Sequence, residues 1–298
     1  MNKISIFLAL VVLSSCKNST MHAQEKNGLA TENYFKDGKE FAFEEKLHFE
    51  YSVDQKELKV YNLNGDVHIE EHGGDKIIVD IIKTIKSKTQ EKMEQGKASI
   101  KLGVDESQGL TLYIEEPIDT RPKDGDKNVD YDSNTWKYSF NVDYHIKLPK
   151  NFNGKIQSVN GDLIINNSTL TLEANTVNGD VKIDNAKAIG DSQTVNGDIE
   201  ILAGGFLSDN IDIATINGDI NLSVPKDVNA EISFESLNGE FYTDFENAEI
   251  LNKVNKTVKD SNGNKSYKLN KIEGIMLGTG VSKIKCKNVN GDIFIKQI

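Results

Sequence analysis

One short pattern recurs seven times along this chain and limits its possible folds more than any other feature. It runs apolar, Asn, Gly, acidic, apolar, any residue and, in six of the seven copies, a further apolar residue. The glycines of five consecutive copies are separated by 18, 18, 21 and 21 residues. A fixed spacing near 20 residues is typical of proteins built from stacked repeats. The copies begin at Leu63, Val159, Val177, Val195, Ile216, Leu237 and Val289.

The Asn-Gly pair allows two interpretations, because between apolar runs it also predicts a tight β-hairpin. In one continuous strand, the first, third, fifth and seventh residues of each copy share a face. In a hairpin the first residue lies on the opposite face, although it is apolar in all seven copies. We therefore favour continuous strands and expect the first residue, Val195 for example, to point into the core. The alternation slips by one at residues such as Thr176 and Thr215, which predicts a corner of the chain just before each copy.

The predicted fold class is all-β, a β-solenoid of stacked coils of about 18–21 residues with parallel pairing between coils. Residues 151–298 form its regular part. Residues 40–150 are a less regular β-rich part that extends or caps the stack, because the end of a repeat array must be covered. Within it we expect strands at 76–85 and 109–117, a short helix at 89–95, and a mobile loop at about 118–134.

The N-terminus has the features of an export signal. Lys3 is followed by an apolar run from Ile4 to Leu13, which is too short to cross a bilayer as a helix because about 20 residues are needed. The run closes with "LSSC", which resembles the bacterial lipobox. The resemblance implies that residues 1–16 are a lipoprotein signal peptide and that Cys16 carries the lipid anchor. The polar residues 17–39 are expected to be a flexible tether.

Composition argues against a nucleic-acid role. The net charge is −11, and Arg121 is the only arginine among 35 basic residues. Nucleic-acid recognition favours arginine forks and basic patches. With Cys16 acylated, Cys286 has no partner for a disulfide bond within the chain, and its position in "KIKCKNV" predicts a small buried hydrophobic residue.

The acidic residue of each copy is the first candidate for chemistry. Stacked carboxylates repel one another unless they are spread, hydrogen-bonded or bridged by a cation such as calcium. The alternatives are a structural role in the turn, cation binding and catalysis, and we favour the first because every copy carries the same residues. We expect no catalytic residue, no cofactor and no metal site, with calcium on Asp162, Asp180, Asp198 and Asp219 as the alternative. The expected structural turn residues are Asn64, Gly65, Asn160, Gly161, Asn178, Gly179, Asn196, Gly197, Asn217, Gly218, Asn238, Gly239, Asn290 and Gly291.

Histidines and known motifs add little. His68 and His72 are four residues apart, but their stretch predicts a strand and a Gly-Gly turn, so we expect a simple surface pair. No nucleophile elbow, phosphate-binding loop, HExxH or paired CxxC is present in the sequence.

The repeats resemble the bacterial family DUF4097, whose members are described as putative adhesins. The resemblance rests on the "VNGDI" copies and on "LKVYNLNGDVHIE" from Leu58 and "VPKDVNAEISFESLNGE" from Val224, and it covers about Leu58 to Ile298. It implies a β-helix-like fold in an exported or membrane-tethered protein. We expect a non-enzymatic cell-envelope lipoprotein that acts as an adhesin or binding scaffold. The alternatives are a polysaccharide-acting β-helix enzyme and a calcium-stiffened spacer.

Partners and location follow from the same features. The expected partners are the membrane, through the lipid anchor, and an envelope protein or glycan, with no nucleic acid. In similar lipoproteins of Bacteroidota, surface export often follows an acidic run after the Cys. Here "KNST" follows Cys16, which favours an outer-membrane protein that faces the periplasm, with surface exposure as the alternative.

Overall fold

The computed structural model describes residues 5–7, 29–52, 54–122, 136–166, 170–186, 190–204, 210–251, 257–261, 264–268 and 274–298. No helix in these ranges is long and apolar enough to cross a membrane. Cys16 and most of the expected loop at 118–134 lie outside the described residues.

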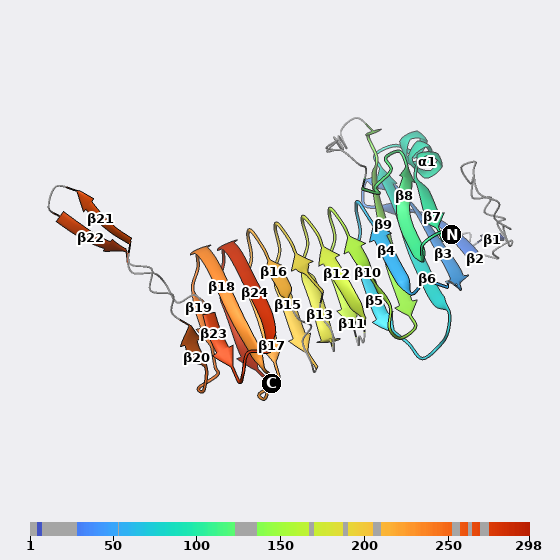
Figure 1. The fold of residues 1–298 in the computed structure, drawn as a ribbon. Coiled ribbons are helices and arrows are strands. Elements are labelled where there is room, and N and C mark those ends of the chain that lie inside the picture. The colour runs from blue at the N-terminus through green and yellow to red at the C-terminus, as the bar shows by residue number, and fades with distance from the viewer. Residues whose placement is uncertain are drawn as a thin grey trace.

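The fold is all-β, as predicted, and consists of two large sheets whose inner faces share one hydrophobic core (Figure 1). Sheet A contains, in spatial order, β1 (Ser5–Phe7), β2 (Leu29–Asp37), β3 (Glu40–Tyr51), β6 (Ile77–Ser87), β9 (Ser139–Leu148), β5 (Val67–Glu71), β11 (Leu163–Asn166), β13 (Val181–Ala186), β15 (Ile199–Ala203), β17 (Ile220–Val224), β25 (Ile293–Gln297) and β19 (Phe241–Thr243). Sheet B contains β20 (Glu249–Leu251), β23 (Gly274–Leu277), β18 (Ala230–Asn238), β24 (Ser282–Asn290), β16 (Ile211–Ala214), β14 (Ser192–Gln193), β12 (Thr171–Asn175), β10 (Asn153–Gln157), β4 (Glu57–Tyr61), β8 (Leu110–Glu116) and β7 (Lys101–Asp105). A separate two-stranded sheet pairs β21 (Thr257–Ser261) with β22 (Asn264–Lys268).

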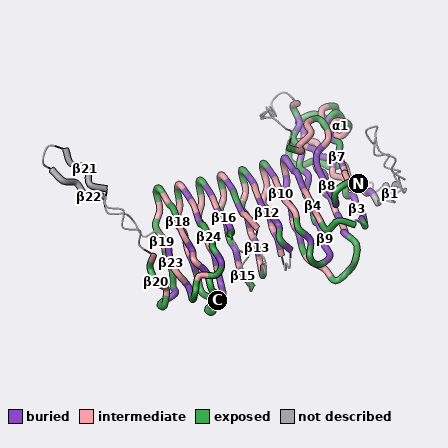
Figure 2. The backbone as a smooth tube through the Cα atoms, viewed as in Figure 1, coloured by how far each residue is buried: buried purple, intermediate pink, exposed green. Residues whose placement is uncertain are grey.

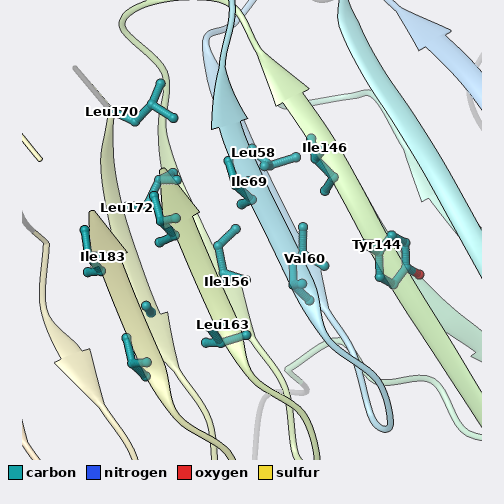
Figure 3. Packing of buried hydrophobic residues seen from close by; sticks show 14 of the residues in the cluster. Leu58, Val60, Ile69, Tyr144, Ile146, Ile156, Leu163, Leu170, Leu172 and Ile183 are labelled. Atoms are coloured by element: carbon teal, nitrogen blue, oxygen red, sulfur yellow. The ribbon is translucent and has the colours of Figure 1, made fainter. Parts of the chain in front are cut away.

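One repeat forms one coil of the chain, with a strand in sheet B, a sharp corner and a strand in sheet A. In the coil of β10 and β11, Leu163 pairs in register with Val67 on one side and with Val181 on the other. The parallel pairing therefore stacks the same repeat position in every coil. The fifth and seventh residues point inward in every copy except the one that starts at Leu237, where Thr243 is exposed. Their rows fill the core together with sheet B residues such as Leu58, Ile156 and Leu172 (Figure 3).

Contrary to our prediction, the first residue does not point inward in six of the seven copies; Leu63, at 7% exposed, is the exception and belongs to the core. Val159, Val177 and Ile216 are 36%, 38% and 44% exposed, and Val195 is half-buried. Instead the residue before it is buried, for example Thr194 at 4%. The corner spans this residue and the four that follow, so the strand in sheet A starts only after the acidic residue. The buried and exposed positions alternate regularly along each coil (Figure 2).

The coils do not stack in the order of the sequence. β24 lies between β16 and β18, and β25 lies between β17 and β19. The coil of Gly291 therefore lies between the coils of Gly218 and Gly239. The spacing of 21 residues between these two glycines would instead suggest that their coils are neighbours. The two coils of Gly65 and Gly161 are neighbours in space, although most of the N-terminal part lies between them in sequence.

The N-terminal part covers one end of the stack. β9 extends sheet A beside β5 in parallel, and β6, β3 and β2 continue it with antiparallel pairing. Helix α1 (Gln90–Ser99) confirms the predicted helix: the Thr89 hydroxyl accepts the backbone N–H of Lys92 as its N-cap. The predicted strands at 76–85 and 109–117 correspond to β6 and β8. The expected tether at 17–39 is too long, because residues 29–37 form β2.

Candidate functional site

The corner of each repeat is the most regular feature of the surface, and we call it the NGD corner (residues 158–162 and their equivalents in the other coils). Its first side chain points inward and ties two coils together. The hydroxyl groups of Thr176, Thr194 and Thr215 donate to the carbonyl oxygens of Gly161, Gly179 and Gly197 at 3.0, 2.8 and 3.0 Å. Because the hydroxyl group takes the inward place, the apolar residue that follows faces outward.

The asparagines form one continuous ladder along the corner. Each side-chain amide donates to the side-chain oxygen of the asparagine in the neighbouring coil at 2.7–2.8 Å. The ladder runs through Asn64, Asn160, Asn178, Asn196, Asn217, Asn290 and Asn238, which is the order of the coils in space. All seven predicted asparagines therefore meet in one structure.

The glycines of the corner leave no room for a side chain. A Cβ built on Gly179, Gly197 or Gly218 would overlap the carbonyl oxygen of the glycine in the preceding coil. Gly291 also has a φ of 132°, which L-residues rarely adopt. The same overlap occurs at Gly161, Gly239 and Gly291, and Gly65 meets the Val142 carbonyl oxygen.

The acidic residues form a second ladder. The Oδ1 atoms of Asp162, Asp180 and Asp198 accept the backbone N–H groups of Asp180, Asp198 and Asp219, each at 2.8 Å. Asp219 accepts from Asp292 in the same way, and Asp292 accepts from Glu240. Each carboxylate thus satisfies a backbone donor that the corner would otherwise leave unpaired.

This arrangement bears on the calcium candidates. Asp162, Asp180, Asp198 and Asp219 lie in one row, but one oxygen of each is already bonded to the backbone. Among the described residues, no three His, Cys, Asp or Glu side chains are gathered closely enough to hold a metal ion. These hydrogen bonds support a structural role for the four aspartates. The backbone N–H dipoles balance part of the negative charge of their carboxylates.

The outward apolar residues of the corner form a third row, which we call the corner stripe: Val159, Val177, Val195, Ile216, Val289 and Leu237. Its members are half-buried or exposed, and Leu237 at one end is 70% exposed. Backbone hydrogen bonds hold neighbouring coils together along the row: the N–H groups of Asn178, Asn196, Asn217 and Asn290 donate to the carbonyl oxygens of Val159, Val177, Val195 and Ile216. The NGD corner therefore presents parallel apolar, amide and carboxylate rows to solvent.

Cys286 agrees with its prediction. It is a free, fully buried cysteine on the inner face of β24. Burial raises the pKa of its thiol to about 12, so the reactive thiolate is scarce at neutral pH.

The structure also brings together titratable residues that the sequence does not connect. His48 of β3, Asp80 of β6, His145 of β9 and His68 of β5 lie in consecutive register across sheet A. His48 Nδ1 lies 2.6 Å from Asp80 Oδ1, and the rings of His68 and His145 stack at 4.7 Å. His68 pairs with His145 and not with His72, whose ring nitrogens bond to its own turn. The four residues are spread from 48 to 145, so only the strand order could have revealed the row.

Part of the chain is similar to a known protein family. Residues 141–274 match the family model "Toastrack DUF4097". No curated protein matches the chain.

Several solved structures are similar at low identity. A protein from Clostridium sporogenes described as a "putative cell adhesion protein" is 14% identical, with a TM-score of 0.41 over 85% of this chain and 99% of that chain. A "putative adhesin" from Bacteroides fragilis is also 14% identical, with a TM-score of 0.37 over 85% and 97% of the two chains. A "putative lipid binding protein" from Parabacteroides distasonis is 12% identical, with a TM-score of 0.28 over 84% and 96%.

Proposed function

We propose that this chain is an exported lipoprotein of the DUF4097 type, a β-solenoid that acts by binding at the cell envelope and not as an enzyme. The observation that carries the proposal is the corner stripe. Apolar side chains repeat on the outside of successive coils, although the hydroxyl groups behind them already hold the corner together. A contiguous row of exposed apolar residues rimmed by polar groups marks an interaction surface more often than isolated exposed residues do.

The rows of the NGD corner fit an extended partner. A molecule lying along the corner meets an aliphatic side chain, an amide and a carboxylate in every coil, about every 4.8 Å. A glycan or an extended protein segment of the envelope offers apolar surface together with hydroxyl or amide groups over such a length. The alternation of rows supplies both contact area and hydrogen-bond partners, as binding surfaces do.

The anchor explains how the surface is held at the envelope. Lipidation of Cys16 would attach the chain to the membrane, because several acyl chains give stable binding where one is marginal. Residues 17–28 would then separate the lipid from β2. β1 pairs with β2 and lies at the edge of sheet A, so cleavage before Cys16 leaves the pairing of β2 with β3 intact. We propose an outer-membrane location facing the periplasm.

Two experiments test the proposal. Replacement of Cys16→Ser is expected to move the protein from the membrane fraction to the soluble fraction or to leave it unprocessed. A mature protein whose intact mass shows no acyl groups contradicts the anchor.

The binding surface is tested in cells by a photo-crosslinking amino acid placed at Val177 of the stripe. The matched control carries it at Lys182, an outward residue of β13 in the same coil. A crosslinked product that forms from position 177 and not from position 182 supports the stripe. This product is expected to disappear when Ile216→Asp and Leu237→Asp are added to the variant that carries the crosslinker at position 177. Equal products at both positions, or none at 177, contradict it. If the wild type co-sediments with purified sacculi and the Ile216→Asp/Leu237→Asp variant does not, the partner is a glycan.

A further inference from the structure

Two imidazole rings lie unusually close together on the outer face of sheet A. His68 of β5 and His145 of β9 are direct register partners on neighbouring parallel strands. Their ring centroids are 4.7 Å apart and their planes differ by 28°. His145 is exposed and His68 is half-buried, and among the described residues neither ring makes a hydrogen bond. Both rings therefore keep their nitrogen atoms available to a ligand from solvent.

The surroundings of the pair are rich in carboxylates. Asp143 precedes His145 by two residues on β9 and therefore lies on the same face, and Asp66 is the corner residue two before His68, just ahead of β5. Asp80 is the register partner of His145 on its other side and orients His48 at 2.6 Å. Lys147, two residues after His145 on the same face, is already paired with Glu70 at 2.8 Å. The local field thus favours a positive ligand.

We propose that His68 and His145 together bind a divalent transition-metal ion such as Zn²⁺ or Cu²⁺. Neutral imidazole suits Zn, Cu and Ni, with metal–nitrogen bonds of about 2.0–2.1 Å for zinc. Rotation of the two side chains, which lie on adjacent strands, would direct one nitrogen of each ring to a shared ion. In the part of the chain that the structure describes, no third His, Cys, Asp or Glu side chain is gathered with them, so water would complete the coordination, and the carboxylates on the same face stabilise the charge.

Cu²⁺ binding to the purified full-length chain, with any affinity tag removed, tests the proposal. Titration calorimetry at pH 7.5 gives the affinity, and electron paramagnetic resonance reports the number of coordinated nitrogens. His68→Gln and His145→Gln are each expected to weaken binding at least about tenfold and to remove one nitrogen from the spectrum. Both side chains face outward, so neither variant is expected to lower the melting temperature appreciably.

His72→Gln is the matched control. His72 follows β5 in the same region, but its nitrogens lie 2.8 Å from the Lys76 carbonyl oxygen and 3.2 Å from the Gly74 N–H donor. Its substitution is expected to leave the affinity and the spectrum unchanged. Cys286 does not compete, because its thiol is buried.

Three results overturn the inference: no Cu²⁺ binding by the wild type at micromolar concentration, binding unaffected by His145→Gln, or an equal loss in His72→Gln. None of these outcomes depends on the corner stripe, so the metal site and the proposed binding function fail or stand separately.

Discussion

Each glycine of the NGD corner meets the same steric limit. A Cβ on Gly197 would overlap the carbonyl oxygen of Gly179, and this oxygen belongs to backbone that the hydrogen bonds of two coils hold in place. The overlap therefore cannot be relieved by rotating a side chain.

Gly197→Ala is expected to destabilise the protein by about 1–3 kcal/mol or more, the usual scale of overpacking in a fixed structure. Urea unfolding measures the difference. The control is Gly73→Ala, because a Cβ at Gly73 meets nothing within 4 Å. Equal stability of the two variants would show that the coils are not this closely spaced.

The two residues at the start of the corner are expected to respond in opposite ways. Thr194 is buried and donates to the Gly179 carbonyl oxygen at 2.8 Å, whereas Val195 is half-buried and faces outward. Thr194→Val is expected to cost about 1 kcal/mol, the typical value of one hydrogen bond. Val195→Asp is expected to cost less than about 0.5 kcal/mol, as surface substitutions do. A large loss of stability in Val195→Asp would restore the inward orientation that we predicted from the sequence.

The acidic ladder is expected to be structural and independent of calcium. In Asp180→Asn the side-chain oxygen still accepts the Asp198 N–H, so the change in stability is expected to stay within about 1 kcal/mol. Removal of calcium with EGTA is expected to leave the melting temperature unchanged. A calcium-dependent gain in the wild type that Asp180→Asn abolishes would instead support a bridged row.

At the scale of the elements, strand type was predictable and strand order was not. The apolar alternation identified the strands of the repeats, and the stretch at 89–95 predicted a short helix, which the structure shows as α1 with Thr89 as its N-cap. The orientation of the first repeat residue was predicted wrongly in six of the seven copies, with Leu63 as the exception. A continuous strand and a corner show the same apolar pattern, and only the buried hydroxyl group distinguishes them. β24 and β25 lie between strands that precede them in the sequence, and no local pattern encodes this long-range pairing.

This pairing predicts a specific effect of truncation. β18 and β19 pair with β24 and β25 and not with β16 and β17. Removal of residues 282–298 is therefore expected to expose β18 and β19 to hydrogen exchange while β10 to β15 keep their protection.

Deletion of residues 257–268 is the control, because within the described ranges β21 and β22 pair only with each other. It is expected to leave the protection of β18 unchanged. Continued protection of β18 and β19 after removal of residues 282–298 would contradict the strand order.

For the whole molecule, the sequence predicted the stack better than the surfaces that the stack creates. The Asn and Asp rows were predictable because they repeat, but their ladders depend on the neighbouring coil. The row of His48, Asp80, His145 and His68 was not predictable, because its members come from four separate strands and belong to no repeat. Both proposed sites consequently depend on the order of the strands.

A cysteine-pair experiment tests that order most directly. Neighbouring strands lie about 4.8 Å apart and next-neighbours about twice as far, while a disulfide bond requires Cα atoms about 4.4–6.8 Å apart. Asn221 of β17 is in register with Phe294 of β25, which separates it from Tyr242 of β19. After mild oxidation of the native protein, mass spectrometry is expected to find a disulfide bond in Asn221→Cys/Phe294→Cys and none in Asn221→Cys/Tyr242→Cys. A disulfide bond in the second pair and not in the first would mean that the coils stack in sequence order, and would contradict the fold described here.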